Sequence, residues 1–210
     1  MKPHSGCLRL YHNQILKDAA FLKRREESSK IGRILDAGCG CGRASRTLID
    51  RLEKTPEIIG IDLDTLSMKY GRSQGPNVHF MRSHMGYLPF RNQTFDMILS
   101  SKAIHEIENQ QERSKTVDEF TRTLRRDGII YVLDIFARYY IAKLIRRLLH
   151  TLSAKIEWYS RTGEFEKNLK GRGLTILRRE CMPSRPYSLS LHCSYIATKK
   201  TRKAKHKNAR

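Results

Sequence analysis

Three closely spaced glycines follow a short apolar run near the start of the chain. The segment from Ile31 to Gly42 reads IGRILDAGCGCG, in which Asp36 closes the run and Gly38, Gly40 and Gly42 follow. This pattern predicts a buried strand that ends in a tight turn, because glycine reaches φ values closed to other residues and lets a ligand lie against the main chain. From Arg43 the apolar residues recur at helical spacing, so the turn is expected at a helix N-terminus, where free N–H groups bind ligand oxygens. The segment therefore predicts the outline of a nucleotide-cofactor pocket.

The spacing of the glycines separates two classes of such pockets. The dinucleotide fingerprint G-x-G-x-x-G would need a glycine at position 43, where this chain has Arg43. The observed spacing is G-x-G-x-G, and LDAGCGCG resembles the first motif of the class I S-adenosylmethionine-dependent methyltransferases, usually LDxGCGxG. The alternative interpretation is a tight structural turn. The resemblance implies that Asp36 and the glycine turn hold the methionine end of S-adenosylmethionine.

A second acidic position follows at the end of the next expected strand. The run EIIGIDLD places Asp62 at the strand tip, where a carboxylate can accept hydrogen bonds from two ribose hydroxyls. Leu63 beside it can lie against an adenine ring. Asp62 could instead cap the following helix, although Asp64 is also available for that role.

A third block strengthens the resemblance. Leu88-Pro89-Phe90 and Phe95-Asp96 match an L-P-F turn and an F-D strand start that recur in the same methyltransferases. In that family an acidic residue four positions before the turn bonds the adenine amino group, whereas this chain has His84 there, followed by Met85. A neutral imidazole nitrogen can still accept such a bond and a protonated one cannot. The resemblance assigns His84 and Met85 to the adenine.

The expected fourth strand ends in residues suited to the reaction centre. Strand carboxyl ends line the ligand crevice of open α/β sheets, so Ser100 is expected near the methionine part of the cofactor. His105 stands where the family commonly faces its substrate, and it could take a proton or could simply cap or pack the next helix. No N/D-P-P-Y/F motif follows this strand, which argues against methylation of exocyclic amino groups or of glutamine.

The remaining elements and the resemblance together predict the fold. We expect an α/β, Rossmann-like three-layer αβα sandwich with a seven-stranded, mostly parallel sheet in the order 3-2-1-4-5-7-6 and an antiparallel last strand. The methyltransferase domain is expected over residues 31–199, preceded by a helix and charged linker over 1–30. That helix either closes over the pocket or packs against the sheet.

Positive charge is concentrated outside the motifs. The 41 Lys and Arg against 21 Asp and Glu give a net charge of +20, and residues 200–210 form a basic tail that we expect to be disordered. A basic amphipathic helix is expected at about 136–152, as a substrate lid, a membrane-surface element or an ordinary packed helix. The charge attracts RNA, anionic lipid or acidic small molecules without selecting among them, or is only a solvated surface.

Composition bounds the setting of the protein. No apolar stretch is long enough to cross a membrane and no signal peptide is evident, which predicts a cytoplasmic protein that could bind a membrane surface. Five scattered cysteines fit neither a disulfide framework nor a zinc site, so we expect reduced thiols and no metal.

The sequence thus predicts a methyltransferase that uses S-adenosylmethionine on a small-molecule or lipid-like acceptor. Two alternatives stay open: an RNA or protein methyltransferase recruited by the basic surface and tail, and a methyltransferase-like binding module without activity.

Overall fold

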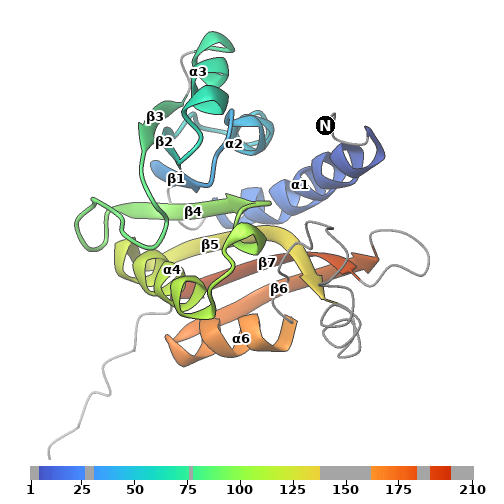
Figure 1. Cartoon of the computed structure of the whole chain (residues 1–210). Coiled ribbons are helices and arrows are strands. Elements are labelled where there is room, and N and C mark those ends of the chain that lie inside the picture. Colours follow the sequence, from blue (N-terminus) through green and yellow to red (C-terminus); the bar gives the residue numbers. More distant parts are fainter. Residues whose placement is uncertain (1–4, 27–30, 76–77, 138–161, 184–189, 200–210) are drawn as a thin grey trace, which may run out of the picture.

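One seven-stranded sheet forms the centre of the computed structural model, which describes residues 5–26, 31–75, 78–137, 162–183 and 190–199 (Figure 1). In chain order the strands are β1 (Arg33–Ala37), β2 (Glu57–Asp62), β3 (His79–Arg82), β4 (Phe95–Ser101), β5 (Leu124–Ala137), β6 (Leu174–Pro183) and β7 (Ser190–Lys199). Their spatial order is β3-β2-β1-β4-β5-β7-β6. The first five strands are parallel, and β7 is antiparallel to both of its neighbours. The predicted fold class and strand order are confirmed.

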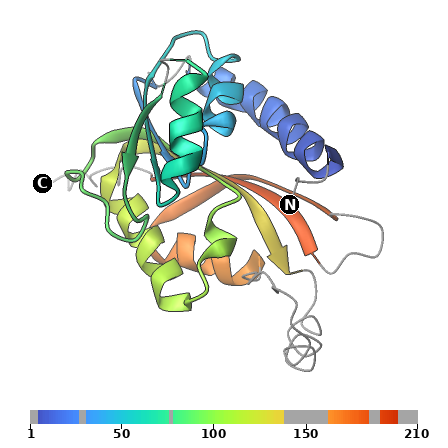
Figure 2. The same ribbon diagram turned by 45° about the horizontal axis from the view of Figure 1, so that its top comes forward.

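Helices cover both faces of the sheet (Figure 2). They are α1 (Ser5–Glu26), α2 (Arg43–Ile49), α3 (Thr65–Ser73), the 3₁₀ turn η1 (Ile104–Glu106), α4 (Gln110–Thr123) and α6 (Thr162–Gly171). Successive residues of a strand point to opposite faces. Ile34 accordingly packs with α1 and α2, whereas Leu35 packs with α4 and α6. Burial on both faces explains why the parallel strands read as continuous apolar runs.

Strand β5 spans 14 residues and begins at Leu124, directly after α4. It runs to Ala137, and Asp127 near its start adopts a φ of 58°. Residues 136 and 137 therefore belong to β5 rather than to a helix. The rest of the helix expected at 136–152, and the tail at 200–210, lie outside the described residues.

Helix α1 is fixed to the sheet by apolar and polar contacts. Ile15 and Leu22 are buried against the sheet face that α2 also covers. Asp18, fully buried on the same helix, accepts hydrogen bonds from the Tyr131 hydroxyl (2.9 Å) and the Gln14 amide (3.1 Å). Burial raises the pKa of Asp18, although these hydrogen bonds and an ion pair with Arg178 (3.2 Å) oppose the shift. The described part of the helix thus packs against the sheet, the second of the two roles considered for it.

A carboxylate ties β1 to β4 at the amino ends of these strands. Asp96 Oδ2 accepts the backbone N–H groups of Gly32 (3.0 Å) and Arg33 (2.9 Å). Its Oδ1 accepts a hydrogen bond from Arg125 Nη1 at 2.7 Å. The F-D pair of the sequence therefore has a structural role, at the end of the sheet opposite the glycine turn.

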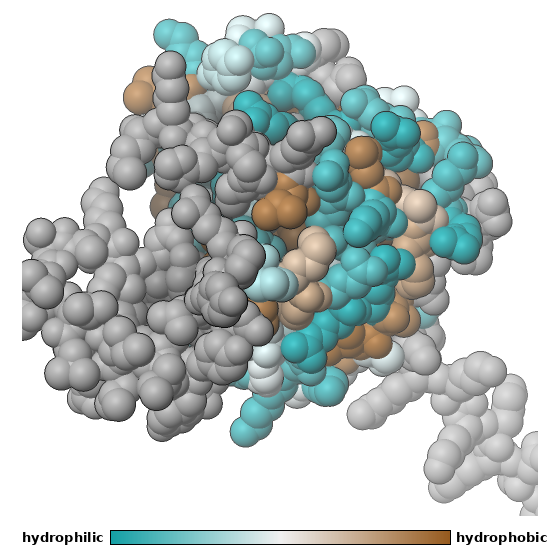
Figure 3. Space-filling view, turned by 90° about the vertical axis from the view of Figure 1, so that its right-hand side faces the viewer, coloured by the Kyte–Doolittle hydropathy of each residue, from teal (hydrophilic) through white to brown (hydrophobic). Residues whose placement is uncertain are grey.

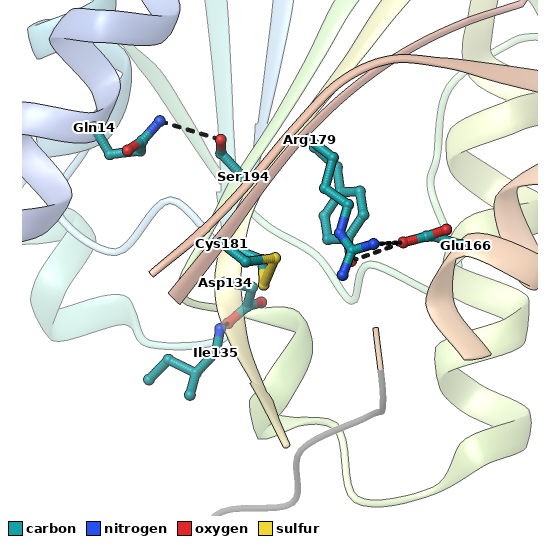
Figure 4. The surroundings of a disulfide bond; sticks show 9 residues. Gln14, Asp134, Ile135, Glu166, Arg179, Cys181 and Ser194 are labelled. Carbon is teal, nitrogen blue, oxygen red and sulfur yellow. Dashed lines mark hydrogen bonds and ion pairs between the residues drawn. A yellow bond between two sulfur atoms is a disulfide. The ribbon is translucent and has the colours of Figure 1, made fainter. Parts of the chain in front are cut away.

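A disulfide joins the last two strands and corrects an expectation about the cysteines. Cys181 of β6 and Cys193 of β7 pair directly in the antiparallel register and form a disulfide. The expectation of reduced cysteines is wrong for this pair, because strand register brings together two residues that are 12 apart in sequence. Figure 4 shows the disulfide next to Asp134, whose register partner on β7 is Cys193. Cys39 and Cys41 are free thiols.

The surface beside α1 is mostly polar. Figure 3 faces the side toward which α1 and the ends of β5 and β7 project in Figure 1. Hydrophilic residues cover most of the described surface there, and hydrophobic ones form small separate areas between them. Within the described ranges, no helix is both long and apolar enough to cross a bilayer.

Candidate functional site

The glycine turn joins β1 to α2 with three left-handed residues. Gly38, Gly40 and Gly42 have φ values of 73°, 51° and 75°. The N–H groups of Gly38 and Cys39 both donate to the carbonyl oxygen of Ile61, which fixes the turn against β2. A Cβ on Gly38 would lie 2.2 Å from Ala103 Cβ, whereas a Cβ on Gly40 would meet nothing within 4 Å. The turn is thus closed on its Ala103 side and open at Gly40, where a ligand can approach the backbone.

Asp36 is a buried carboxylate without a hydrogen-bond partner. Its side chain is fully buried, and neither oxygen accepts a hydrogen bond from any described residue. Ser45, a neighbouring hydroxyl on α2, donates to the Gly42 carbonyl at 3.1 Å. Burial raises the pKa of Asp36 to about 6; the nearby hydroxyl and N–H groups of Ser45, which make no hydrogen bond of standard geometry to it, oppose the shift, and repulsion from Asp62 adds to it. An unpaired buried carboxylate is costly, so this one calls for a cationic or hydrogen-bond-donating ligand.

Ser100 is the second unpartnered polar group at this end of the sheet. It is fully buried near the carboxyl end of β4, and its Oγ has no hydrogen-bond partner among the described residues. The register pairs Asp36 of β1 with Leu99, the residue before Ser100. The structure therefore brings Asp36 and Ser100 to neighbouring positions on adjacent strands, as strand order predicts.

Asp62 lies at the tip of β2 and contacts the glycine turn. Its Oδ2 accepts the Gly40 N–H at 2.7 Å, and its Oδ1 accepts the Asp64 N–H at 2.9 Å. Asp64 caps α3 by accepting the N–H groups of Leu66 (2.9 Å) and Ser67 (3.2 Å). The capping role considered for Asp62 therefore belongs to Asp64. Each Asp62 oxygen keeps lone-pair capacity for a further donor.

Leu63 and Met85 flank the turn with apolar surface. The Leu63 side chain, next to Asp62, is 54% exposed. The Met85 sulfur lies 3.5 Å from the position that a Cβ on Gly38 would occupy. Both residues are therefore available to cover a flat apolar ligand near the glycine turn.

The ring of His84 presents a donor rather than an acceptor. Its Nδ1 accepts the backbone N–H of Gly86 at 3.0 Å. A neutral imidazole has one acceptor and one donor nitrogen, so the proton of the neutral ring is on Nε2. The ring also contacts Tyr87, with centroids 5.6 Å apart. The acceptor capacity that we expected His84 to offer is thus already used.

His105 is held by a carboxylate that the sequence did not single out. Its Nδ1 lies 2.5 Å from Asp134 Oδ1, and both side chains are buried. Asp134 Oδ2 accepts the N–H of Ile104 (2.8 Å), and the N–H of His105 lies at 3.3 Å from the same oxygen. A carboxylate in this position orients the imidazole and stabilises its protonated form, as in other His–Asp pairs. The available signal was Asp134 itself, a polar residue late in an otherwise apolar strand.

No metal site competes with this arrangement in the part of the chain that the structure describes. No group of three or more His, Cys, Asp or Glu side chains there could hold a metal ion. The polar groups named above cluster at the carboxyl ends of β1, β2, β4 and β5, which is the usual ligand edge of an open α/β sheet.

Comparison with known proteins identifies relatives of this arrangement. Residues 34–128 match a family described as "Methyltransferase domain". The ubiquinone/menaquinone biosynthesis C-methyltransferase of Campylobacter jejuni is 32% identical over 110 residues, covering 50% of this chain and 46% of the relative. The malonyl-[acyl-carrier protein] O-methyltransferase of Enterobacter lignolyticus is 28% identical over 120 residues, covering 57% and 45%. The matched segments thus span about half the length of these relatives.

Solved structures share the fold over more of the chain. An S-adenosylmethionine-dependent methyltransferase of Methanosarcina mazei superposes with a TM-score of 0.68 at 18% identity. The match covers 83% of this chain and 95% of that one. A geranyl diphosphate methyltransferase in complex with S-adenosylmethionine gives a TM-score of 0.67 at 15% identity, covering 87% and 84%. At such identities these matches concern the fold.

Proposed function

We propose that this chain, whose sequence and fold are those of the class I S-adenosylmethionine-dependent methyltransferases, binds S-adenosylmethionine and transfers its methyl group to a small-molecule acceptor. The observation that carries the proposal is the unpartnered, fully buried carboxylate of Asp36 beside the glycine turn. The methionine end of the cofactor carries an ammonium group. Pairing with it would supply the positive charge that Asp36 lacks in the described structure.

The other expected residues fit the remaining parts of the cofactor. Asp62 can accept hydrogen bonds from the ribose hydroxyls while it keeps its bonds to the Gly40 and Asp64 N–H groups. Leu63 and Met85 offer apolar surface to the adenine. His84 would donate from Nε2 to a ring nitrogen of the base, since its Nδ1 is engaged by Gly86. Ser100 would bond the methionine end beside Asp36.

His105 and Asp134 are the groups proposed for proton transfer. Bound S-adenosylmethionine supplies an electrophilic methyl group on a sulfonium. Asp134 holds the His105 ring through Nδ1, so Nε2 is the nitrogen that would take a proton from the acceptor. The backbone N–H bonds to Asp134 keep this carboxylate fixed during the transfer. The protein otherwise has only to align the acceptor with the methyl group and exclude water.

The names of the relatives indicate the acceptor class. One relative is a C-methyltransferase of quinone biosynthesis and another is an O-methyltransferase of malonyl-acyl carrier protein. The first name concerns quinone biosynthesis, and the second concerns a malonyl group attached to a carrier protein; in both, the group that is methylated belongs to a small organic molecule, which supports a small-molecule acceptor here. The alternatives of RNA, protein or a membrane surface rest on net charge and on segments outside the described residues, and they stay predictions.

Calorimetric titration with S-adenosylmethionine and S-adenosylhomocysteine tests the cofactor site. We expect Asp62→Ala to weaken binding about 100-fold, because two charge-assisted hydrogen bonds are lost at about 1.5 kcal/mol each. Asp64→Ala is the matched control, since it removes a neighbouring carboxylate that caps α3 and should leave the affinity nearly unchanged. A wild-type protein that binds neither compound would overturn the proposal.

Turnover tests the catalytic pair separately. With labelled S-adenosylmethionine and small-molecule extracts as acceptors, we expect His105→Gln to lower kcat by about 10²- to 10⁴-fold, the usual contribution of general-base catalysis. Asp134→Asn should lower kcat less and shift the pH profile, while S-adenosylhomocysteine affinity stays unchanged in both variants. Full activity of His105→Gln would exclude His105 as the base.

A further inference from the structure

Lys102 occupies a strained position at the end of β4. Its φ of 57° lies in the left-handed region, which is uncommon for residues other than glycine and is often retained at functional sites. Its N–H donates to the Leu133 carbonyl at 2.9 Å, which fixes the backbone against β5. The next residue, Ala103, packs against the glycine turn at Gly38. Lys102 therefore stands between the proposed cofactor turn and the carboxyl end of β5.

The Lys102 ammonium belongs to a small group of side chains from three distant elements. Its Nζ lies 5.1 Å from the centre of the Tyr11 ring of α1, within the range of a cation–π contact. The His192 ring of β7 packs edge-on against the same Tyr11 ring at 4.8 Å. No carboxylate among the described residues pairs with Lys102. The charge of Asp134 opposes the lowering of the His192 pKa by burial and by Lys102. The Asp134 oxygens themselves are engaged by His105 and by backbone N–H groups.

His192 is a buried ring with an unused nitrogen. The residue is 6% exposed, and its Nδ1 has no hydrogen-bond partner within the described part of the chain. Burial, and next the charge of Lys102, lower the pKa of His192, so the ring is neutral at pH 7 and can donate from one nitrogen. His192 lines a small hollow together with Leu10, Tyr11, Gln14, Leu133 and Met182. The hollow is thus mostly apolar, His192 in its wall has a nitrogen without a hydrogen-bond partner, and Lys102 contacts the Tyr11 ring that also lines it.

We propose that Lys102 and His192 bind a carboxylate next to the methyl donor. The proposal rests on the proposed function and adds the chemical class of a ligand group. An ammonium without a carboxylate partner and a buried donor nitrogen suit the two oxygens of a carboxylate, and apolar side chains adjoin them. The carboxylate can come from an apolar acid that serves as acceptor, or from the methionine end of the cofactor.

Three ligands distinguish these sources in calorimetry: S-adenosylhomocysteine, which has the methionine carboxylate; 5′-methylthioadenosine, which lacks it; and benzoate, titrated in the presence of 5′-methylthioadenosine. Each is measured with the wild-type protein, Lys102→Met and Lys102→Arg. Lys170→Met, an exposed lysine on α6, is the matched control for loss of one positive charge. Thermal unfolding of each variant checks the fold.

We expect Lys102→Met to weaken one carboxylate ligand by about 10- to 100-fold, the range for a hydrogen bond to a charged group, with partial recovery in Lys102→Arg. A loss confined to S-adenosylhomocysteine, with 5′-methylthioadenosine unchanged, assigns the site to the cofactor. A loss confined to benzoate assigns it to the acceptor. The proposal is overturned if Lys102→Met and Lys170→Met behave alike for both carboxylates, or if the wild type binds neither carboxylate. If Asp62→Ala leaves the affinity for S-adenosylhomocysteine unchanged, the proposed cofactor site is wrong, and this failure is separate from that of the Lys102 site.

Discussion

The two halves of the sheet are held together by different kinds of interaction. Strands β1 to β4 are short, parallel and connected through helices, and their contacts are mainly apolar side chains and backbone hydrogen bonds. Strands β5 to β7 are longer and antiparallel at the edge. The Cys181–Cys193 disulfide joins β6 to β7, and ion pairs of Arg178 with Asp18 and of Arg179 with Glu166 join β6 to α1 and α6. Figure 4 shows the Arg179–Glu166 ion pair on one side of the disulfide and the Gln14–Ser194 hydrogen bond on the other. The second half therefore has, beyond its backbone ladder and apolar contacts, a covalent link between strands and ion pairs to the neighbouring helices.

The glycine turn offers the strongest test of the first half. A Cβ at Gly38 would collide with Ala103 and would also face a φ of 73°, so we expect Gly38→Ala to reduce the free energy of unfolding by about 3 kcal/mol or more. Gly40→Ala is the matched control, because its φ is also positive but its surroundings are open, and about 1 kcal/mol is expected. Urea denaturation measures both. Equal losses in the two variants would show that backbone strain alone, without the Ala103 contact, governs the turn.

The disulfide tests the second half. Closing a loop between residues 12 apart stabilises by about 2–3 kcal/mol in the chain-entropy account, so a Cys181→Ser/Cys193→Ser variant should lose that amount. We expect hydrogen exchange to accelerate in β6 and β7 and to stay unchanged in β1 and β2. Dithiothreitol should destabilise the wild type and leave the double variant unaffected. Uniform loss of protection across all seven strands would mean that the halves unfold as one unit.

Replacing Asp36 should change the free energy of unfolding by a smaller amount and in the stabilising direction. Its pKa of about 6 in the folded protein lies above the ordinary value of 3.8, so folding becomes less favourable as pH rises from about 4 to 6. Asp36→Asn should therefore stabilise the cofactor-free protein at pH 7.5 by about 1–3 kcal/mol, since each pKa unit corresponds to 1.36 kcal/mol. The gain should shrink as pH falls toward 4, and cofactor binding should be weakened. Urea denaturation at pH 7.5 and 4.5 measures this difference. If Asp36→Asn is less stable than the wild type at pH 7.5, the buried Asp36 charge does not lower the stability of the cofactor-free protein.

The same contrast explains what the sequence could predict. The turn, Asp62 at a strand tip and the order of the strands follow from short motifs and from a family resemblance carried by adjacent residues. The His105–Asp134 pair was missed because its partners are 29 residues apart, on the turn η1 and on strand β5. The Cys181–Cys193 bond was missed for the same reason, since it requires the register of β6 on β7. The start of β5 at Leu124, immediately after α4 and without a connecting loop, follows from no sequence motif.

Asp96 adds a consequence for how such a protein can change over time. Because this carboxylate fastens β1 to β4 at their amino ends, the alignment of the sheet is set far from the ligand edge. Residues such as Lys102 and His192 at the opposite edge can then be exchanged without loss of strand alignment. A library that varies only the carboxyl edge, with Asp96 kept, should therefore retain folded members while exploring new acceptors. The architecture separates the residues that keep the fold from those that select what it acts on.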